Sequence, residues 1–153
     1  MASSNLAGKL EAEIQLKSNG DEFFHSFGGK AHKLPDLVNH KVKSIVVHEG
    51  DWKTENSIKL WTYVIDGKVE VFKERLKIDE ETKTVTAVAI DGDCMKHYKK
   101  YIASIQVVSR DGSSFAKISV EYEKLNENEP IPTKYLDWII HTTKDVDASL
   151  IKA

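Results

Sequence analysis

The sequence lacks the features from which disulfide-stapled or membrane-anchored proteins are built. Cys94 is the single cysteine among 153 residues, which excludes a disulfide framework, and the three prolines leave long stretches free to form strands and helices. No run approaches the roughly 20 apolar residues of a membrane-spanning helix. The first residues also lack the apolar segment of a secretory signal. We therefore expect a soluble, cytoplasmic protein without a membrane span.

An excess of charge of one sign is lacking as well. The chain has 22 Lys and Arg against 24 Asp and Glu, a formal net charge of −2. This balance offers no general attraction to nucleic acid, so we expect no nucleic-acid partner. With 41% hydrophobic residues, the chain can bury a core of its own. We expect a single ligand-binding domain over residues 1–153, present as a monomer or weak dimer.

One stretch, residues 131–150, has the pattern of a long amphipathic helix. Its apolar positions recur at steps of three and four residues, and polar residues occupy the other side. Pro132 suits the first helical position, where a missing N–H costs nothing. Such a helix would be about 28 Å long, enough to cross a whole sheet. The predicted buried face consists of Tyr135, Trp138, Ile139, Thr142, Val146 and Ser149.

Two short helices are predicted near the start of the chain, after a strand at residues 6–16 whose apolar and polar residues alternate. Ser18 and Asp21 resemble a capping box that begins the first helix, and Gly28 and Gly29 would end it. Pro35 would start or kink the second helical piece, at residues 30–39.

Six further strands are indicated by runs rich in β-branched and aromatic residues. The pairs Asp66-Gly67 and Asp111-Gly112 are typical of tight hairpin turns, which join antiparallel neighbours. The order strand, two helices, six strands and a long helix predicts an α+β fold with the helices on one face of an antiparallel sheet. The six runs cover residues 42–47, 57–65, 68–78, 82–90, 97–108 and 114–125.

Many side chains predicted to face the helix are small. Alanine and valine opposite a single helix leave space that is either a cavity or tighter packing. The inward candidates are Val69, Val71, Val85, Ala87, Tyr101, Ala103, Ile105, Val107, Ala116, Ile118, Val120 and Tyr122.

Several local strings, in this order and spacing, resemble the major latex proteins of plants, within the birch-pollen-allergen-like (Bet v I, START-like) superfamily. The similarity spans nearly the whole chain. The strings are LWTYVIDGK at 60–68, FKERL at 72–76, AIDGDCMKHYKKY at 89–101, VEYEKLNENEPIP at 120–132 and KDVDASL at 144–150.

The resemblance implies a seven-stranded curved antiparallel sheet wrapped around the C-terminal helix, two short helices between strands 1 and 2, and an internal hydrophobic cavity. It also implies a carrier or sensor of hormones, sterols, fatty acids or flavonoids that is linked to defence and stress responses. One departure is the stretch HEGDWKTENS at 48–57, which has only Gly50 where related proteins carry a glycine-rich loop. A phosphate cradle is therefore not expected there.

The predicted cavity wall combines apolar residues with a few polar groups that would orient a ligand. We expect hydroxyls from Tyr101 and Tyr122 and a guanidinium from Arg75 to face the ligand, with entry beneath Trp52, Met95 and the first turns of the long helix. The candidates are Phe27, Leu37, Trp61, Tyr63, Val71, Arg75, Val85, Ala87, Met95, Tyr101, Ala103, Ile105, Ala116, Val120, Tyr122, Tyr135, Trp138, Ile139 and Thr142.

Each of these groups also has a purely structural interpretation. Buried phenols can bond to one another or to the backbone, and Arg75 can form a surface ion pair. Trp52 can anchor its own loop, and Met95 can fasten a loop to the core.

No cofactor or metal is expected, because the six histidines show no metal-ligand spacing and Cys94 has no companion cysteine. A catalytic Cys94 and His97 pair is a remote alternative, so we predict no catalytic residues. Two other functions stay open. One is a cavity enzyme of specialised metabolism, a cyclase or isomerase, and the other is a protein-interaction module with a vestigial cavity.

Overall fold

The computed structural model describes residues 6–152, so the outermost ends of the domain expected at 1–153 lie outside the described residues. Two short 3₁₀ turns, Ala31–Lys33 and Asp93–Lys96, interrupt the larger elements. In chain order these are β1 (Ala7–Leu16), α1 (Gly20–Phe27), α2 (Leu34–Leu37), β2 (Val42–Glu49), β3 (Ile58–Ile65), β4 (Lys68–Asp79), β5 (Thr84–Gly92), β6 (Tyr98–Arg110), β7 (Ser113–Lys124) and α3 (Thr133–Lys152).

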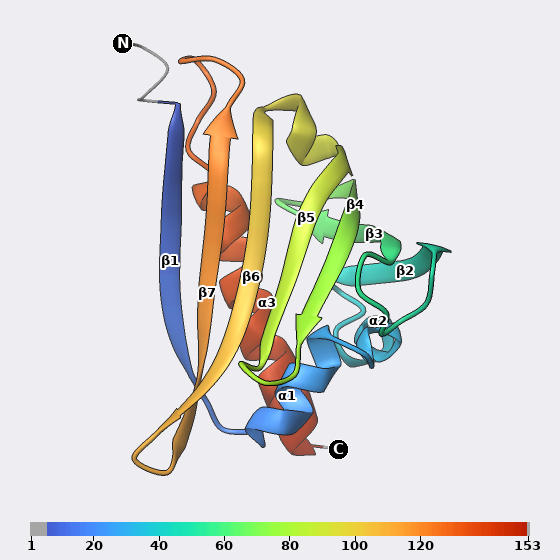
Figure 1. Cartoon of the computed structure of the whole chain (residues 1–153), viewed down its shortest axis with the longest axis vertical. Coiled ribbons are helices and arrows are strands. Elements are labelled where there is room, and N and C mark those ends of the chain that lie inside the picture. Colours follow the sequence, from blue (N-terminus) through green and yellow to red (C-terminus); the bar gives the residue numbers. More distant parts are fainter. Residues whose placement is uncertain (1–5, 153) are drawn as a thin grey trace.

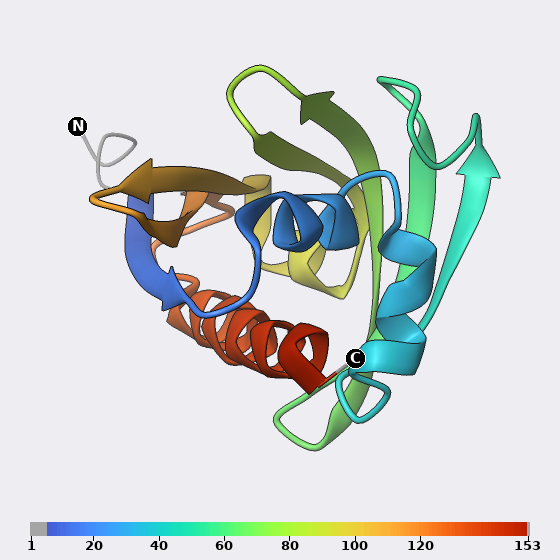
Figure 2. The same cartoon turned by 90° about the horizontal axis from the view of Figure 1, so that it is seen from below.

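All seven strands form one antiparallel sheet in the order β1-β7-β6-β5-β4-β3-β2. From β2 to β7, strands that follow each other in the sequence pair with each other, and β1 pairs with β7 at the edge opposite β2. Figure 1 shows α3 running behind the sheet, and Figure 2 shows the sheet curving around α3 with α1 and α2 at one end. The predicted fold class is confirmed. No helix within residues 6–152 is both long and apolar enough to cross a membrane.

The two predicted aspartate-glycine turns are the tight turns of β3–β4 and β6–β7. Asp66 and Gly67 have φ values of +50° and +74°, and Asp111 and Gly112 have +52° and +80°. Positive φ at both central residues matches the right-handed twist of the paired strands. The short sequence signal therefore places these strands directly beside each other.

The first helix begins with a different cap from the one predicted. The side chain of Asn19 accepts hydrogen bonds from the backbone N–H groups of Asp21 and Glu22, at 2.9 and 3.1 Å. Ser18, the predicted cap, instead donates its hydroxyl to Asp147, 2.5 Å away in α3. The prediction at Ser18 is wrong because a buried carboxylate outcompetes the local cap for this hydroxyl. The end of α1 before Gly28 is as predicted.

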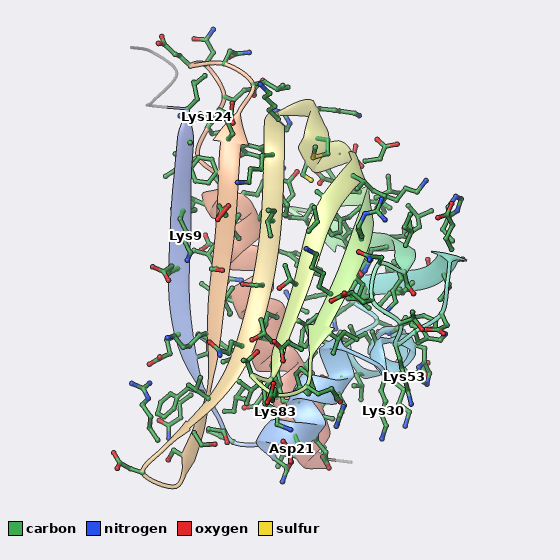
Figure 3. The ribbon with its side chains drawn as sticks, in the orientation of Figure 1. Lys9, Asp21, Lys30, Lys53, Lys83 and Lys124 are labelled. Carbon is green, nitrogen blue, oxygen red and sulfur yellow. The ribbon has the colours of Figure 1, made fainter. Side chains whose placement is uncertain are left out.

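An ion pair fixes α1 against the turn between β4 and β5. Figure 3 shows Lys83 and Asp21 at the same end of the molecule, and Lys83 Nζ lies 2.9 Å from Asp21 Oδ1. Lys83 also lies over the ring of Phe24, 5.5 Å from its centroid. Since both charged side chains are partly exposed, the pair contributes at most about 1 kcal/mol. The pair mainly helps to hold α1 in place, and α1 in turn places Phe27 in the interior.

The long helix runs from Thr133 to Lys152, whereas the pattern predicted residues 131–150 with Pro132 at the first helical position. Pro132 precedes α3, and its carbonyl accepts the N–H groups of Tyr135 and Leu136. On the predicted face, three residues are buried and three are half-buried. The buried ones are Tyr135, Thr142 and Val146, and the half-buried ones are Trp138, Ile139 and Ser149.

The prediction of which β4 side chains face the interior is wrong. Val69 is 65% exposed and Val71 is 39% exposed, whereas Glu74 and Leu76 are buried. The two-residue turn at Asp66-Gly67 determines the register, since it places Glu70 opposite Tyr63 and Phe72 opposite Trp61 in the next strand, β3. Cross-strand partners share a face, so burial of the two β3 aromatics turns the even-numbered residues of β4 inward.

Candidate functional site

A pocket with a volume of about 100 Å³ lies between the sheet and the first half of α3. Strands β3 to β6 and α3 supply most of its wall, and Phe27 closes it from α1. The wall is almost entirely apolar, which suits a molecule held by hydrophobic burial. The residues that line it are Phe27, Trp61, Tyr63, Phe72, Glu74, Val85, Ala87, Cys94, Tyr101, Ala103, Ser104, Ile105, Tyr135, Trp138 and Ile139.

The structure brings together eleven of the nineteen residues predicted for the cavity wall. They come from α1, from the three strands β3, β5 and β6, and from α3, so the residues predicted to face inward from these three strands meet in one pocket. The eleven are Phe27, Trp61, Tyr63, Val85, Ala87, Tyr101, Ala103, Ile105, Tyr135, Trp138 and Ile139.

The other predicted residues lie away from the pocket wall. Val71 and Arg75 were wrongly placed, because both alternate with the inward residues of β4 and so lie on its outer face. Leu37 and Met95 are half-buried against the core. The remaining four are buried in the core outside the pocket wall, and they are Ala116, Val120, Tyr122 and Thr142.

Four lining residues were missed. Phe72 and Glu74 are on the face of β4 that the sequence pattern assigned to solvent, although the Asp66-Gly67 turn carried the register that places them inside. Cys94 contributes a buried thiol from the turn after β5. Ser104 lines the pocket while its hydroxyl bonds to that of Ser119, 2.6 Å away.

The most unusual group in the wall is the carboxyl of Glu74. Burial raises its pKa to about 7, against the opposing influence of the nearby Lys59 ammonium and a smaller one from the indole of Trp61. Lys59 is the cross-strand partner of Glu74, and burial likewise lowers the pKa of Lys59. Burial therefore disfavours the charged forms of both groups, which are paired on the inner face of β3 and β4.

The ammonium of Lys59 is held by the loop between β2 and β3. Its Nζ donates to the carbonyl of Trp52 at 3.2 Å and lies 4.9 Å from the centroid of the Trp52 ring. His32 packs edge-on against the same ring at 5.3 Å. Trp52 does not line the pocket, so these contacts favour its interpretation as a loop anchor over that of a cover for the entrance.

Two fully buried side-chain atoms in the pocket wall have no hydrogen-bond partner among the described residues. They are Oε2 of Glu74 and Nε1 of Trp61. The indole N–H lies close enough to lower the pKa of the Glu74 carboxyl somewhat, yet the geometry of a hydrogen bond is not reached. A buried polar group without a partner costs about 1–3 kcal/mol, so this corner of the pocket carries a penalty that a bound molecule can relieve.

Two of the four predicted phenols are satisfied by a carboxylate. Tyr63 and Tyr135 donate to Oε1 of Glu70 at 3.0 and 2.9 Å, and Lys134 donates to its other oxygen at 3.4 Å. Burial and the adjacent carboxylate raise the pKa of both phenols. Their hydroxyls thus fasten α3 to β4 and are not free to bind a ligand.

Tyr101 and Tyr122, predicted to present hydroxyls to a ligand, occupy different places. Tyr101 lines the pocket, and burial raises its pKa well above the usual value. No hydrogen bond joins its hydroxyl to another residue within 6–152. Tyr122 packs against β1, where a Cβ at Gly8 would lie 2.5 Å from its hydroxyl oxygen. Only Tyr101 remains available to the pocket.

The cysteine is not equipped as a nucleophile. Burial raises the pKa of the Cys94 thiol to about 12, so it is protonated at neutral pH. His97 bonds instead to Glu129, with Nδ1 2.8 Å from Oε1. In the described part of the chain no cluster of three or more His, Cys, Asp or Glu side chains could hold a metal ion.

Comparison with known proteins agrees with this architecture. The sequence profile of the pathogenesis-related protein Bet v 1 family matches residues 5–153. MLP-like protein 31 of Arabidopsis thaliana is 36% identical over 152 residues, covering 97% of this chain and 89% of that protein. The crystal structure of major latex-like protein 151 from Panax ginseng superposes with a TM-score of 0.91 at 35% identity, covering 94% of this chain and 97% of the other.

A more distant structural neighbour is an enzyme. Norcoclaurine synthase from Thalictrum flavum superposes with a TM-score of 0.74 at 19% identity, covering 99% of this chain and 91% of that one. At this level of identity the similarity concerns the fold alone.

Proposed function

The chain belongs to the pathogenesis-related protein Bet v 1 family, and from that premise we propose that it is a noncatalytic carrier or sensor of small, largely apolar molecules. The observation that supports this function best is the apolar pocket enclosed by α3 and strands β3 to β6. Such a wall holds a ligand by hydrophobic burial, and a few polar groups set its orientation. The ligand classes we propose are plant hormones, sterols, fatty acids and flavonoids, with a role in defence or stress responses in the cytoplasm.

The pocket volume limits which molecules enter without rearrangement. A volume of about 100 Å³ is smaller than an engineered apolar cavity of about 150 Å³ in another protein, which binds benzene. Even a single ring therefore requires a small movement of side chains, and a sterol or flavonoid requires a larger one. Trp138 and Ile139 are the half-buried lining residues of α3 and are the groups we expect to move.

Ligand titration tests the proposal directly. Trp61 and Trp138 line the pocket, so a ligand should change their fluorescence and raise the melting temperature. A panel of hormones, sterols, fatty acids and flavonoids should contain at least one compound with both effects. If no member of the panel changes either quantity, the carrier function is wrong.

Filling the pocket provides a matched control. Ala103→Leu adds a larger side chain to the wall and should abolish binding, whereas Val71→Leu makes a similar addition on the exposed outer face of β4 and should leave binding unchanged. Equal loss of binding in both variants would show that the ligand is bound elsewhere.

A second candidate function is catalysis within the same pocket, and Glu74 is the observation that favours it. A buried carboxyl with a pKa of about 7 is suited to move a proton at neutral pH. We would expect a cyclase or isomerase to turn over alkaloid or polyketide precursors and Glu74→Gln to abolish that turnover. Ligand binding without turnover across such a panel favours the carrier. The remaining volume of about 100 Å³ is the observation that counts against the third alternative, a protein-interaction module with a vestigial cavity.

A further inference from the structure

Besides the Tyr101 hydroxyl, the pocket wall contains one fully buried acceptor atom and one fully buried donor atom that lack partners among the described residues. Glu74 is 2% exposed and Trp61 is 9% exposed, and both side chains line the pocket. Oε2 of Glu74 accepts hydrogen bonds when ionised, and Nε1–H of Trp61 can only donate. The other lining indole, that of Trp138, already donates to the carbonyl of Val64 at 2.7 Å. Trp61 and Glu74 are diagonal neighbours on the paired strands β3 and β4, so the two unsatisfied atoms belong to one corner of the pocket.

The charges at this corner disfavour an ionised ligand. Lys59 is fully buried as the cross-strand partner of Glu74, and Asp51 contributes a further negative charge near Lys59. A ligand anion would approach the Glu74 carboxylate, and a ligand cation would meet the field of the Lys59 ammonium. Because a low-dielectric site strengthens both repulsions, a neutral polar group is the one accepted at least cost.

From these contacts we infer that the pocket selects neutral apolar molecules bearing a hydroxyl, whose oxygen donates its proton to Glu74 Oε2 and accepts the N–H of Trp61. A hydroxyl is the smallest neutral group that both donates and accepts through one atom. This assignment depends on the proposed function, because it names the ligand class of the same pocket. The aromatic walls would bind the apolar body of the ligand.

A direct bond between the two protein groups is the competing arrangement. A small rotation of Trp61 would let its N–H donate to Glu74, and no subsite would then exist. A pocket of that kind is purely apolar toward a ligand, and burying a hydroxyl in it without a partner is unfavourable. The two arrangements therefore predict opposite preferences between a hydroxyl and a methyl group.

Three small aromatic probes distinguish these arrangements. Para-cresol, para-xylene and para-toluate share a methyl-bearing ring and differ in a hydroxyl, a methyl or a carboxylate group, and a single ring requires the pocket to expand less than a sterol or flavonoid does. Dissociation constants would be measured by NMR titration of the intact protein. We expect para-cresol to bind about tenfold or more tightly than para-xylene, since hydrogen bonds to charged groups are among the stronger ones. Para-toluate should bind most weakly.

Two variants and a control test whether Trp61 and Glu74 cause the preference for para-cresol over para-xylene. Trp61→Phe keeps a ring and removes the free N–H, so the preference for para-cresol should fall by about tenfold or reverse. The double variant Lys59→Met with Glu74→Leu removes both charges together and should reverse it. Trp138→Phe removes an indole N–H that already has a partner, so it should retain the preference. Folding of each variant would be checked by circular dichroism.

The outcomes separate this inference from the function on which it depends. Binding of para-xylene equal to or tighter than that of para-cresol would overturn the hydroxyl subsite while leaving an apolar carrier intact. Tightest binding of para-toluate would overturn the selection of a neutral group. If Trp61→Phe and Trp138→Phe reduce the preference equally, the subsite is also wrong. Absence of binding by all three probes would contradict the proposed pocket function itself.

Discussion

The two halves of α3 face very different interiors. Its second half packs against β1, α1 and α2, where Asp147 is 6% exposed and accepts hydrogen bonds from the backbone N–H groups of Lys17 and Ser18 and from the Ser18 hydroxyl. In the same half, Ser149 donates to the carbonyl of Leu37 at 2.9 Å. We call this region the closed end.

The first half of α3 faces the pocket, which we call the open end. Trp138 and Ile139 are half-buried there, and the opposite strands hold Glu74 and Trp61 with unpartnered polar atoms. The satisfied side chains of Asp147 and Ser149 stabilise the closed end, although Thr143 Oγ1 lacks a partner there among the described residues. The open end retains a larger penalty, because an indole N–H and a carboxylate oxygen are both unpartnered. The difference indicates that one helix serves stability at one end and binding at the other.

The largest expected change in stability comes from removing the Asp147 carboxylate at the closed end. Asp147→Ala removes the acceptor for three donors, so it should lower the free energy of unfolding by about 4 kcal/mol. Urea unfolding at neutral pH measures this. Asp145→Ala is the control, since Asp145 is partly exposed, pairs with His40 and Lys41, and should cost at most about 1 kcal/mol. If both variants lose a similar amount of unfolding free energy, the buried contacts of Asp147 do not stabilise the closed end more than a surface ion pair does.

At the open end, Glu74 should make stability depend on pH. Its pKa rises from 4.5 in the unfolded chain to about 7 on folding, so the folded protein holds this proton more tightly. The resulting stabilisation is complete below pH 4.5 and is lost as the pH rises through about 7. Between about pH 5 and about pH 8 the loss should be about 2–3 kcal/mol.

Urea unfolding of the native chain and of Glu74→Gln at both pH values isolates this contribution. All other groups are the same in both proteins, so their effect cancels in the difference, and the Glu74→Gln protein should lack the additional loss at high pH. An identical pH dependence in the two proteins would mean that water reaches the carboxyl and that the open end carries no such penalty.

The contrast between the two ends also explains what the sequence could predict. Alternation in the strands, the aspartate-glycine turns and the amphipathic pattern of α3 are local signals, and they predicted the elements, the antiparallel sheet and eleven wall residues. The closed end depends on a long-range contact, because Asp147 binds residues about 130 positions earlier in the chain. No local pattern marks that carboxylate as buried.

The errors at the open end come from β4. Val69 and Val71 were the more hydrophobic alternate residues of that strand, so the local pattern assigned them to the interior and Glu74 to solvent. Cross-strand pairing with Trp61 and Tyr63 reverses this assignment, because two buried aromatics outweigh two valines. A charged residue is placed inside only by its neighbours, and a pattern based on hydrophobicity alone points in the opposite direction.

A matched pair of valine truncations compares the packing of the two ends. Val146, at the closed end, is 0% exposed, and Val85, in the pocket wall, is 8% exposed. Val146→Ala leaves a new cavity in a filled core and should cost about 2 kcal/mol. Val85→Ala only enlarges a space that already exists and should cost about 1 kcal/mol. Thermal and urea unfolding measure both, and equal costs would indicate that the pocket is packed as tightly as the core.

The smallest expected effect compares two hydroxyls on α3 itself. Thr142 is fully buried and its Oγ1 has no partner among the described residues, whereas the Ser149 hydroxyl donates to Leu37. Thr142→Val removes an unsatisfied group with little change of shape and should stabilise the fold by about 1 kcal/mol, while Ser149→Ala removes a satisfied one and should destabilise it by about 1 kcal/mol. Urea unfolding measures both changes. Since Thr142 lies outside the pocket wall, the valine variant should bind ligands unchanged. Destabilisation by Thr142→Val would show that this hydroxyl has a partner in solution and that α3 is satisfied along more of its length than its closed end.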